Sequence, residues 1–281
     1  MTELGECSAA ARPLVMGVLN VTPDSFSDGG RFLDQDAAVA HGLAMVAEGA
    51  DIVDVGGEST RPGAEPVGDI EECRRVVPVI HELARHVRVS VDTRHATVAE
   101  AAVAAGATLV NDVSASLGAL TAAFGGRIGF VAMHMLGDPR TMQDDPRYDD
   151  VVADVRAFLV ERAAAAAELG VEEVWIDPGI GFGKTLEHNL ALLAHLDDLA
   201  ATGFPVLVGT SRKRFLGTLL ATADGLPPGE TVPVDDRLEG SVATAAWAMW
   251  HGARMIRAHD VRATVLAAEV VAQAHERSTG T

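Results

Sequence analysis

The sequence predicts an α/β fold, a single-domain TIM (β/α)8 barrel, and three observations lead to this prediction. Short β-rich segments alternate with alanine-rich helical segments along the 281 residues, as expected for repeated βα units around a parallel sheet. Eight β-rich segments can be counted, which is the number that closes such a barrel. The segments GADIVDV, GATLVNDV and GARMIRAH also repeat one pattern, in which a helix-ending Gly-Ala precedes a short strand.

An open doubly wound sheet is the alternative architecture. Such a sheet normally has fewer strands and carries a phosphate-binding fingerprint after its first strand. The first expected turn, LNVTPDSFSDGG, has no such fingerprint, so the barrel is favoured.

The expected elements follow from these local patterns. Strands are predicted, in chain order, at residues 14–20, 51–55, 88–92, 108–112, 129–134, 174–177, 205–209 and 254–259. Helices are predicted between them, among others at 36–49, 96–106, 149–170 and 235–252, and several close with the glycine that commonly follows a helix. The polar segment 221–236 is expected to be a surface loop. Residues 14–275 are expected to form the barrel, between flexible tails at 1–13 and 276–281.

The composition limits the classes of function. With 48% hydrophobic residues the chain can bury a sizeable core, and its net charge of −18 argues against a general affinity for nucleic acid or an anionic membrane. The two cysteines, Cys7 and Cys73, lack the spacing of a zinc site, which suits a reducing compartment. Residues 1–13 lack the apolar segment of a signal peptide, and no apolar run is long enough to cross a membrane. A cytoplasmic location is therefore expected.

The predicted strands end on polar residues more often than an ordinary barrel requires. The ends carry, in chain order, Asn20, Asp54, Asp92, Asn111, Met133, Asp177, Gly209 and Arg257 with His259. Catalytic groups of TIM barrels lie at the C-terminal ends of the strands, so these side chains should meet on one rim. Each alone could be a helix cap or turn residue, and for Asp54 that reading stays open beside an indirect role in the site. For Asp92, Asn111 and Asp177 together a ligand is favoured, because buried polar groups are costly unless they are satisfied.

The segment WIDPGIGFGKT (175–185) resembles a nucleotide phosphate loop but departs from it at one position. The phosphate-loop pattern needs a glycine where this chain has Pro178, which has no N–H to donate. We therefore interpret Asp177 as a ligand-binding residue at a strand end, followed by flexible backbone. Lys184 is interpreted as a surface lysine near the next helix.

In combination, eight segments resemble the dihydropteroate synthases of folate biosynthesis. They are MGVLNVTPDSFSDGG (16–30), DVGGESTRPGA (54–64), SVDT (90–93), NDV (111–113), MHM (133–135), DPGIGFGKT (177–185), GTSRKRFLG (209–217) and RAHD (257–260). The resemblance runs from about residue 15 to about residue 274. It implies a TIM-barrel enzyme, inhibited by sulfonamides, that joins 6-hydroxymethyl-7,8-dihydropterin pyrophosphate to p-aminobenzoate and releases pyrophosphate.

The resemblance implies three groups of site residues. The pterin site would contain Asp92, Asn111, Met133, Asp177, Phe182 and Lys213, and its carboxylates and carboxamide suit the N–H donors of a pterin edge. Pyrophosphate would be bound by Asn20, Arg61, Arg257 and His259, with Mg2+ held at Asn20 and Asp28. The p-aminobenzoate site would contain Phe26, Ser59, Thr60, Arg61, Pro62, Ser211 and Arg212. The residues expected to act in catalysis are Asp92, Asp177, Lys213, Arg257 and His259.

The expected reaction is a dissociative substitution in which cationic groups stabilise the leaving pyrophosphate. A pterin-binding paralogue without synthase activity is the main alternative, and it should lack the STRPG or SRK segment, both of which are present. A methyltetrahydrofolate:corrinoid methyltransferase would not need the pair Arg257 and His259. The resemblance also implies a homodimer, for which Trp247, Met249 and Trp250 are candidates, although they could equally lie in the core.

Overall fold

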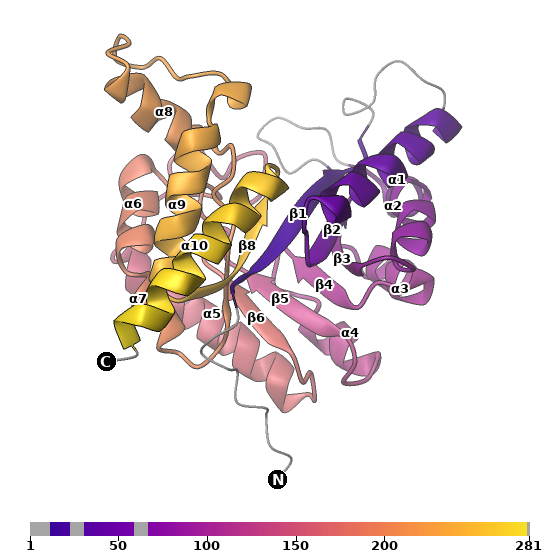
Figure 1. Cartoon of the computed structure of the whole chain (residues 1–281). Helices are drawn as coiled ribbons and strands as arrows, with labels where there is room; N and C mark the ends of the chain where they lie inside the picture. Colours follow the sequence, from indigo (N-terminus) through magenta and orange to yellow (C-terminus); the bar gives the residue numbers. More distant parts are fainter. Residues whose placement is uncertain (1–11, 23–30, 59–66, 280–281) are drawn as a thin grey trace.

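The computed structural model describes residues 12–22, 31–58 and 67–279, which form a closed barrel of eight parallel strands surrounded by helices (Figure 1). The strands follow one another around the barrel in chain order, and the last pairs with the first. They are β1 (Leu14–Asn20), β2 (Ile52–Gly56), β3 (Arg88–Asp92), β4 (Leu109–Asp112), β5 (Gly129–Met133), β6 (Val174–Asp177), β7 (Val206–Val208) and β8 (Ala253–Ala258). The predicted fold class is confirmed, and each predicted strand is present with ends that differ by one residue or less.

The connecting segments contain the helices. These are α1 (Arg31–Ala47), α2 (Asp69–Leu83), α3 (Ala96–Ala105), α4 (Gly118–Ala123), α5 (Val151–Glu168), α6 (Leu186–Ala194), α7 (Leu196–Ala200), α8 (Arg214–Ala223), η2 (Val234–Asp236), α9 (Leu238–Trp250) and α10 (Val261–Thr279). Local chemistry sets some of their ends: the Asp150 carboxylate accepts two backbone N–H groups at the start of α5, and Gly106 closes α3 in a left-handed conformation. Helix α10 continues past the predicted boundary at residue 275. The segment 221–236 is largely exposed, as predicted, and contains the end of α8 and η2.

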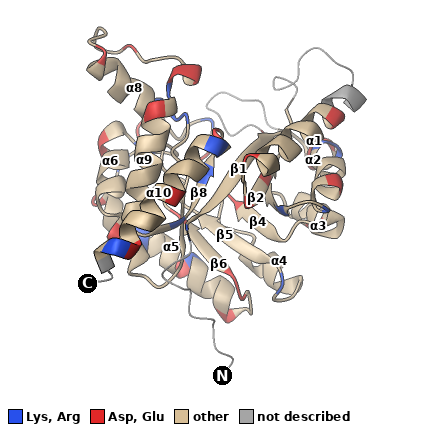
Figure 2. Cartoon of the chain, viewed as in Figure 1, with Lys and Arg blue, Asp and Glu red and all other residues tan. Residues whose placement is uncertain are grey.

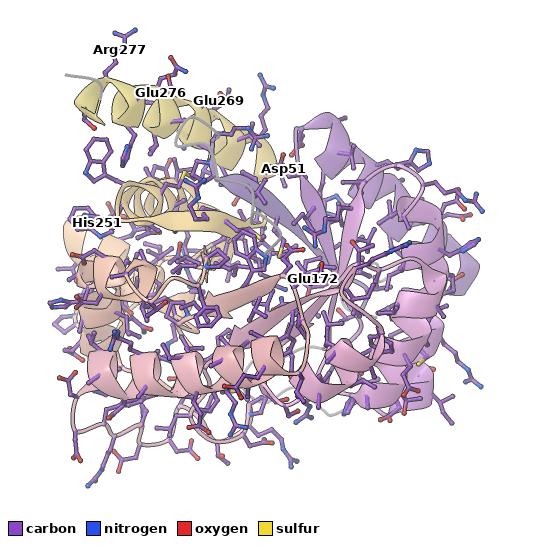
Figure 3. The ribbon with its side chains drawn as sticks, turned by 90° about the horizontal axis from the view of Figure 1, so that it is seen from below. Asp51, Glu172, His251, Glu269, Glu276 and Arg277 are labelled. Atoms are coloured by element: carbon purple, nitrogen blue, oxygen red, sulfur yellow. The ribbon has the colours of Figure 1, made fainter. Side chains whose placement is uncertain are left out.

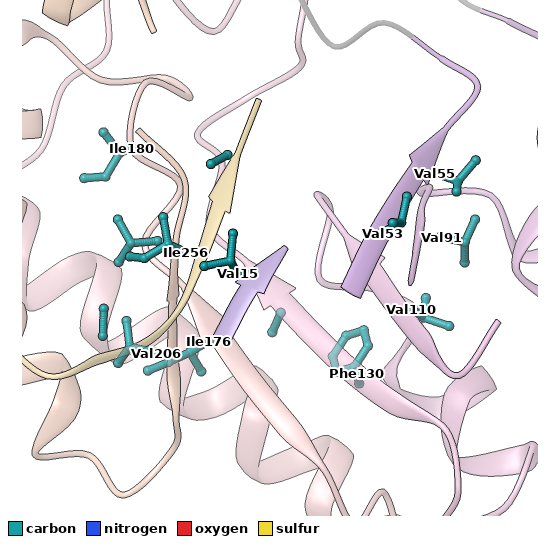
Figure 4. Packing of buried hydrophobic residues seen from close by; sticks show 14 of the residues in the cluster. Val15, Val53, Val55, Val91, Val110, Phe130, Ile176, Ile180, Val206 and Ile256 are labelled. Atoms are coloured by element: carbon teal, nitrogen blue, oxygen red, sulfur yellow. The ribbon is translucent and has the colours of Figure 1, made fainter. Parts of the chain in front are cut away.

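Two apolar layers form because side chains alternate between the faces of each strand. The outward side chains pack against the helices, as Figure 4 shows for Val53, Val91, Phe130 and Ile256. The inward side chains form a separate cluster in the middle of the barrel, which we call the barrel floor. It consists of Met16, Ile52, Leu109, Val131, Trp175, Leu207 and Met255. The middle of the barrel is thus filled by side chains, so a site inside the barrel must lie at one of its ends.

The end of the barrel where the strands begin is closed by ion pairs. Arg88 forms a two-point ion pair with Glu173, at 2.9 and 2.6 Å, and the Trp175 indole N–H donates to the same carboxylate at 2.7 Å. Arg12 pairs with Asp51 and Glu269, and the two acidic residues are labelled in Figure 3, which views the molecule from below. In the view of Figure 2, charged residues lie mainly on helices and loops. Among the described residues, no helix is both long and apolar enough to cross a membrane.

Candidate active site

Most of the predicted strand-end residues lie on the inner face of the strands, one layer above the barrel floor. Each stands two residues after a floor residue, so the two-residue period of a strand turns both toward the barrel axis. The pairs are Ile52 and Asp54, Leu109 and Asn111, Val131 and Met133, Trp175 and Asp177, Leu207 and Gly209, and Met255 and Arg257. Asp92 follows the buried Ser90 in the same way on β3. The layer above the apolar floor is therefore polar.

Arg257 is the centre of this polar layer. Its Nε donates to Asp54 Oδ2 at 2.6 Å, and its terminal nitrogen donates to Asp92 Oδ2 at 2.7 Å. The Asn111 amide also donates to Asp54 Oδ2, at 3.0 Å. Asp54 is fully buried, so it supports Arg257 and Asn111 from below. The sequence had left the role of Asp54 open between a turn residue and an indirect role, and these contacts connect it to two of the predicted site residues.

Two buried acceptors in this layer have no hydrogen-bond partner among the residues that the structure describes. They are Asp54 Oδ1 and Asn111 Oδ1. A buried acceptor without a donor destabilises the folded protein by about 1 to 3 kcal/mol, so such atoms need an explanation in a native structure. A ligand whose N–H groups reach Asn111 would remove this cost. The layer is therefore built to accept hydrogen bonds from something that enters from above.

Burial shifts the protonation equilibria of the charged residues in this layer. It raises the pKa of Asp92 to about 7, against the opposing effect of the Arg257 charge. Burial also raises the pKa of Asp177, although Lys213 and the Gly179 N–H favour its charged form. For Arg257, burial favours the neutral form, but the charges of Asp54 and Asp92 outweigh it and raise the pKa. Arg257 is therefore a permanent cation, and Asp92 titrates near neutral pH.

The loop between β6 and α6 forms one wall of the site. The Gly179 N–H donates to Asp177 Oδ1 at 2.7 Å and thereby orients this carboxylate. From the other side, Lys213 Nζ donates to the carbonyl of Ile180 and lies 4.5 Å from the centre of the Phe182 ring. Burial lowers the pKa of Lys213 to about 8, with Asp177 opposing the shift. Asp177, Phe182 and Lys213, which were predicted to bind one ligand, thus lie together.

Lys184 is buried, so its interpretation as a surface lysine was wrong. Only 3% of the residue is exposed, and its amine lies among loop carbonyls and the His134 side chain. Local sequence gave no sign of this burial, because the partners on His134 are 50 residues away in the chain. The role of this buried cation is considered further below.

Ser211 and Arg212 begin the loop between β7 and α8, beside the end of β8. The Ser211 hydroxyl accepts from the His259 backbone N–H at 3.1 Å and lies 3.1 Å from the His259 Nδ1. Arg212 makes a two-point ion pair with Asp260, at 3.0 and 2.5 Å. These contacts tie the β7 and β8 loops together, and the Arg212 guanidinium is already engaged in an ion pair.

The remaining predicted residues divide into two groups. Asn20, at the end of β1, is half-buried, and Met133, at the end of β5, is buried. Asp28 and the p-aminobenzoate candidates of the first two loops lie outside the described residues. The latter are Phe26, Ser59, Thr60, Arg61 and Pro62.

One further cluster of possible metal ligands was not predicted. The carboxylates of Glu58 and Glu72 and the imidazole of His95 each have a ligand atom within 4.8 Å of the others, beside the loop that follows β2. Within this cluster, His95 Nδ1 lies 2.7 Å from Glu72, while Arg94 pairs with Glu58 at 3.1 Å. Glu58 and Glu72 lie 14 residues apart in the connection between β2 and β3, and His95 lies in the next connection, so no short sequence motif predicts the cluster.

Comparisons with known proteins agree with this geometry. The family model of the pterin binding enzymes matches residues 16–259. A dihydropteroate synthase of Mycobacterium leprae (strain TN) is 52% identical over 266 residues, which cover 92% of this chain and 92% of the relative. A solved Xanthomonas albilineans dihydropteroate synthase with 4-aminobenzoic acid is 49% identical, has a TM-score of 0.83 and is matched over 92% of its chain and 93% of this one. A Yersinia pestis dihydropteroate synthase in a sulfonamide drug complex is 43% identical, with a TM-score of 0.84 and 95% of both chains covered.

Proposed function

Because the chain belongs to the pterin-binding enzyme family, as a member of its dihydropteroate synthases, we propose that it joins 6-hydroxymethyl-7,8-dihydropterin pyrophosphate to p-aminobenzoate. The products are 7,8-dihydropteroate and pyrophosphate, so the chain is a transferase of folate biosynthesis. The observation that carries the site assignment is the buried Asn111 carbonyl oxygen without a partner, in a layer of carboxylates beside Arg257. The alternative, a paralogue without synthase activity, is not favoured.

The pterin ring occupies the space above the barrel floor. Asp92, Asn111 and Asp177 accept from the N–H groups of its aminopyrimidinone edge, which satisfies the free oxygen of Asn111. Lys213 donates to the acceptor edge of the ring, and Phe182 and Met133 pack near its face. The geometry in support is the short distance between Lys213 and the Phe182 ring and the orientation of Asp177 by Gly179.

The pyrophosphate group lies above Arg257 and His259, at the ends of β8 and β1. Asn20 at the end of β1 and Arg61 complete its site. Asn20 also fits a magnesium site, because its amide oxygen is a hard donor of the kind that Mg2+ prefers. With Asp28 as the second ligand, bound Mg2+ would neutralise part of the pyrophosphate charge.

The chemical step breaks the bond between the pterin methylene carbon and the pyrophosphate oxygen. The amine nitrogen of p-aminobenzoate is neutral near pH 7, so it needs no dedicated base to form the new bond to this carbon. The proton that the nitrogen then loses passes to water. Arg257 and His259 stabilise the charge on the departing oxygen. Asp92 and Asp177 stabilise positive charge on the ring as the bond breaks, which lowers the barrier selectively in the transition state.

The p-aminobenzoate site is formed by Phe26, Ser59, Thr60, Arg61 and Pro62 together with Ser211 and Arg212. The carboxylate lies near Ser211 and Arg212. Since Arg212 pairs with Asp260, its guanidinium must share or leave that ion pair to bind a second carboxylate. Sulfonamides, which occupy the Yersinia pestis enzyme, compete for this site.

Two exposed tryptophans favour a dimer through α9 and α10. Met249 is buried in the core, whereas Trp247 and Trp250 are 49% and 47% exposed. Leu266 and Val270 on α10 are exposed as well, at 53% and 69%, and the two helices lie side by side in Figure 1. A second copy of the chain would cover this apolar face. Light scattering at micromolar concentration tests the dimer, and a monomer would contradict it.

The proposed activity is tested by incubating the purified chain with Mg2+, p-aminobenzoate and the dihydropterin pyrophosphate. Dihydropteroate and pyrophosphate should form in equal amounts, and both should be absent when p-aminobenzoate is omitted. Pterin binding without either product would identify the non-catalytic paralogue instead. No binding of the pterin at all would contradict both assignments.

A further inference from the structure

The chain contains only two lysines among its 22 basic residues, and both contact the same loop. Lys213 reaches the loop between β6 and α6 from the ligand side. Lys184 belongs to the loop and turns its amine inward, away from the ligand. The other 20 of these basic residues are arginines. The two lysine ammonium groups therefore lie on opposite faces of the loop between β6 and α6.

The amine of Lys184 is surrounded by acceptors. It lies 3.0 Å from the Phe182 carbonyl oxygen, 3.1 Å from that of Gly179 and 3.3 Å from that of His134. The His134 Nδ1 is a fourth contact, at 3.0 Å. Burial lowers the pKa of His134 to about 3, with the Lys184 charge as the second cause, so this imidazole is neutral and accepts at Nδ1. We call these four acceptors the Lys184 cage.

The glycines of the loop create the cage. Gly179 and Gly183 have φ values of 62° and 61°, in the left-handed region. A Cβ atom on Gly179 would collide with the His134 carbonyl oxygen, and one on Gly183 would lie 2.6 Å from that of Leu136. The loop therefore packs directly on the backbone that follows β5. This close packing turns several carbonyl oxygens toward one point, where a buried cation offsets their mutual repulsion.

The cage is connected to two residues of the pterin site. Gly179 accepts from Lys184 through its carbonyl and donates through its N–H to Asp177 Oδ1. Phe182 accepts from Lys184 through its carbonyl and places its ring beside Lys213. We propose that Lys184 is a positioning residue for the pterin substrate, which fixes the Asp177 carboxylate and the Phe182 ring through the loop backbone without touching the ligand.

Arginine would not replace Lys184 in this position. The cage presents single acceptors from several directions around a small volume, which suits an ammonium with three donors. A guanidinium is larger and planar, and its donors form a fixed fork. Burial lowers the pKa of Lys184 to about 7, against the effect of Asp177, because an ammonium is costly to hold away from water.

The inference rests on the proposed function, and the test compares Lys184→Met with Tyr148→Phe. The first variant keeps an unbranched side chain as far as the ε carbon and removes the amine. The second removes a hydrogen bond of 2.8 Å to Gly183 of the same loop, on the side that does not contact Asp177. If any loosening of the loop weakened pterin binding, both variants would weaken it to the same extent.

Lys184→Met should weaken binding of 6-hydroxymethylpterin, measured by calorimetry, by about tenfold or more, because small displacements of a binding group are costly. The KM for p-aminobenzoate should change by less than about twofold, since its proposed site is separate. Tyr148→Phe should leave the pterin affinity within about twofold of the wild type. Lys184→Arg should not restore the affinity.

Two outcomes would overturn the inference. One is a Lys184→Met variant that melts at a lower temperature but binds the pterin as the wild type does. The other is a Lys184→Met variant in which the dissociation constant of the pterin and the KM for p-aminobenzoate rise by the same factor. If Lys184→Met does not fold, Lys184→Gln, which keeps two donors on a shorter side chain, is measured in the same way. Failure of the wild type to bind the pterin would instead contradict the proposed function.

Discussion

Folding favours the protonated form of the Asp92 carboxyl group, whereas ligand binding favours its charged form. Burial raises its folded-state pKa from 3.8 to about 7, so folding favours the protonated acid. Binding the N–H groups of a pterin requires the carboxylate. The stability that comes with the proton is complete below pH 3.8 and is lost as the pH rises through 7. The protein therefore sacrifices stability at working pH to keep an acceptor in the site.

Replacing Asp92 by asparagine should remove this dependence on pH. The melting temperature of Asp92→Asn relative to the wild type should be higher at pH 8 than at pH 5, because only the wild type must bury a charge at pH 8. Pterin affinity should fall in the same variant. Thermal melts followed by circular dichroism at the two pH values provide the measurement.

Asp150→Asn is the matched control, since it removes a carboxylate from the exposed start of α5. Its difference from the wild type should not follow the pattern of Asp92. A pH-independent difference for Asp92→Asn would show that Arg257 fully compensates the buried charge, against the shift proposed for this carboxyl.

Individual residues also show which contacts the sequence alone does not predict. The polar strand ends could be predicted, because alternation along a strand is a local pattern. The ion pair between Arg257 and Asp54 spans 203 residues, and local pattern carries no information on such partners. For the same reason Lys184 was misread: its neighbours Gly183 and Thr185 suggest an exposed turn, while its burial depends on His134.

Among the elements, the loop between β6 and α6 depends on backbone that only glycine adopts easily. Gly183→Ala would combine the strain of a left-handed alanine, about 1 kcal/mol, with a contact against the Leu136 carbonyl oxygen. Gly125 has a similar φ of 85° and open space around it, so Gly125→Ala would carry the strain alone.

We expect Gly183→Ala to lower the melting temperature clearly more than Gly125→Ala does. The difference between the two isolates the steric contact, which the loop can relieve only by moving off the segment after β5. Urea unfolding of both variants measures the two losses in free energy. Equal losses in the free energy of unfolding would mean that the loop moves easily away from Leu136. That result would also argue against a rigid loop beside the pterin.

The elements themselves were largely predictable, and the reason is physical. Strands buried on both faces read as short apolar runs, and Gly-Ala ends of helices mark where they begin. The position of α10's end was not predictable, since polar residues at a helix end differ little from those of a tail. The residues of the Glu58, Glu72 and His95 cluster come from two successive connections, which the pairing of β2 with β3 brings together.

For the molecule as a whole, the two ends of the barrel have different tasks. At the end where the strands begin, the Glu173 carboxylate accepts hydrogen bonds from both Arg88 and Trp175. At the other end, Arg257 lies beside buried acceptors that lack partners. The barrel floor separates the two layers. Changes at the end where the strands begin should therefore affect stability alone, whereas changes at the other end should affect activity as well.

Two arginine substitutions test this division. Arg88→Met breaks the two-point pair with Glu173 and should cost about 2 kcal/mol of stability, while kcat/KM of the folded enzyme stays near that of the wild type.

Arg257→Lys keeps a positive charge between Asp54 and Asp92, so its melting temperature should change little. The single ammonium of lysine cannot replace the forked guanidinium, which contacts two carboxylates and is proposed to bind the pyrophosphate. The kcat/KM should therefore fall by about a hundredfold. Arg257→Ala is less informative, because it leaves buried carboxylates without a counter-ion and would confound lost activity with lost stability. An Arg88 variant that loses activity while folded would mean that the floor transmits changes between the two ends.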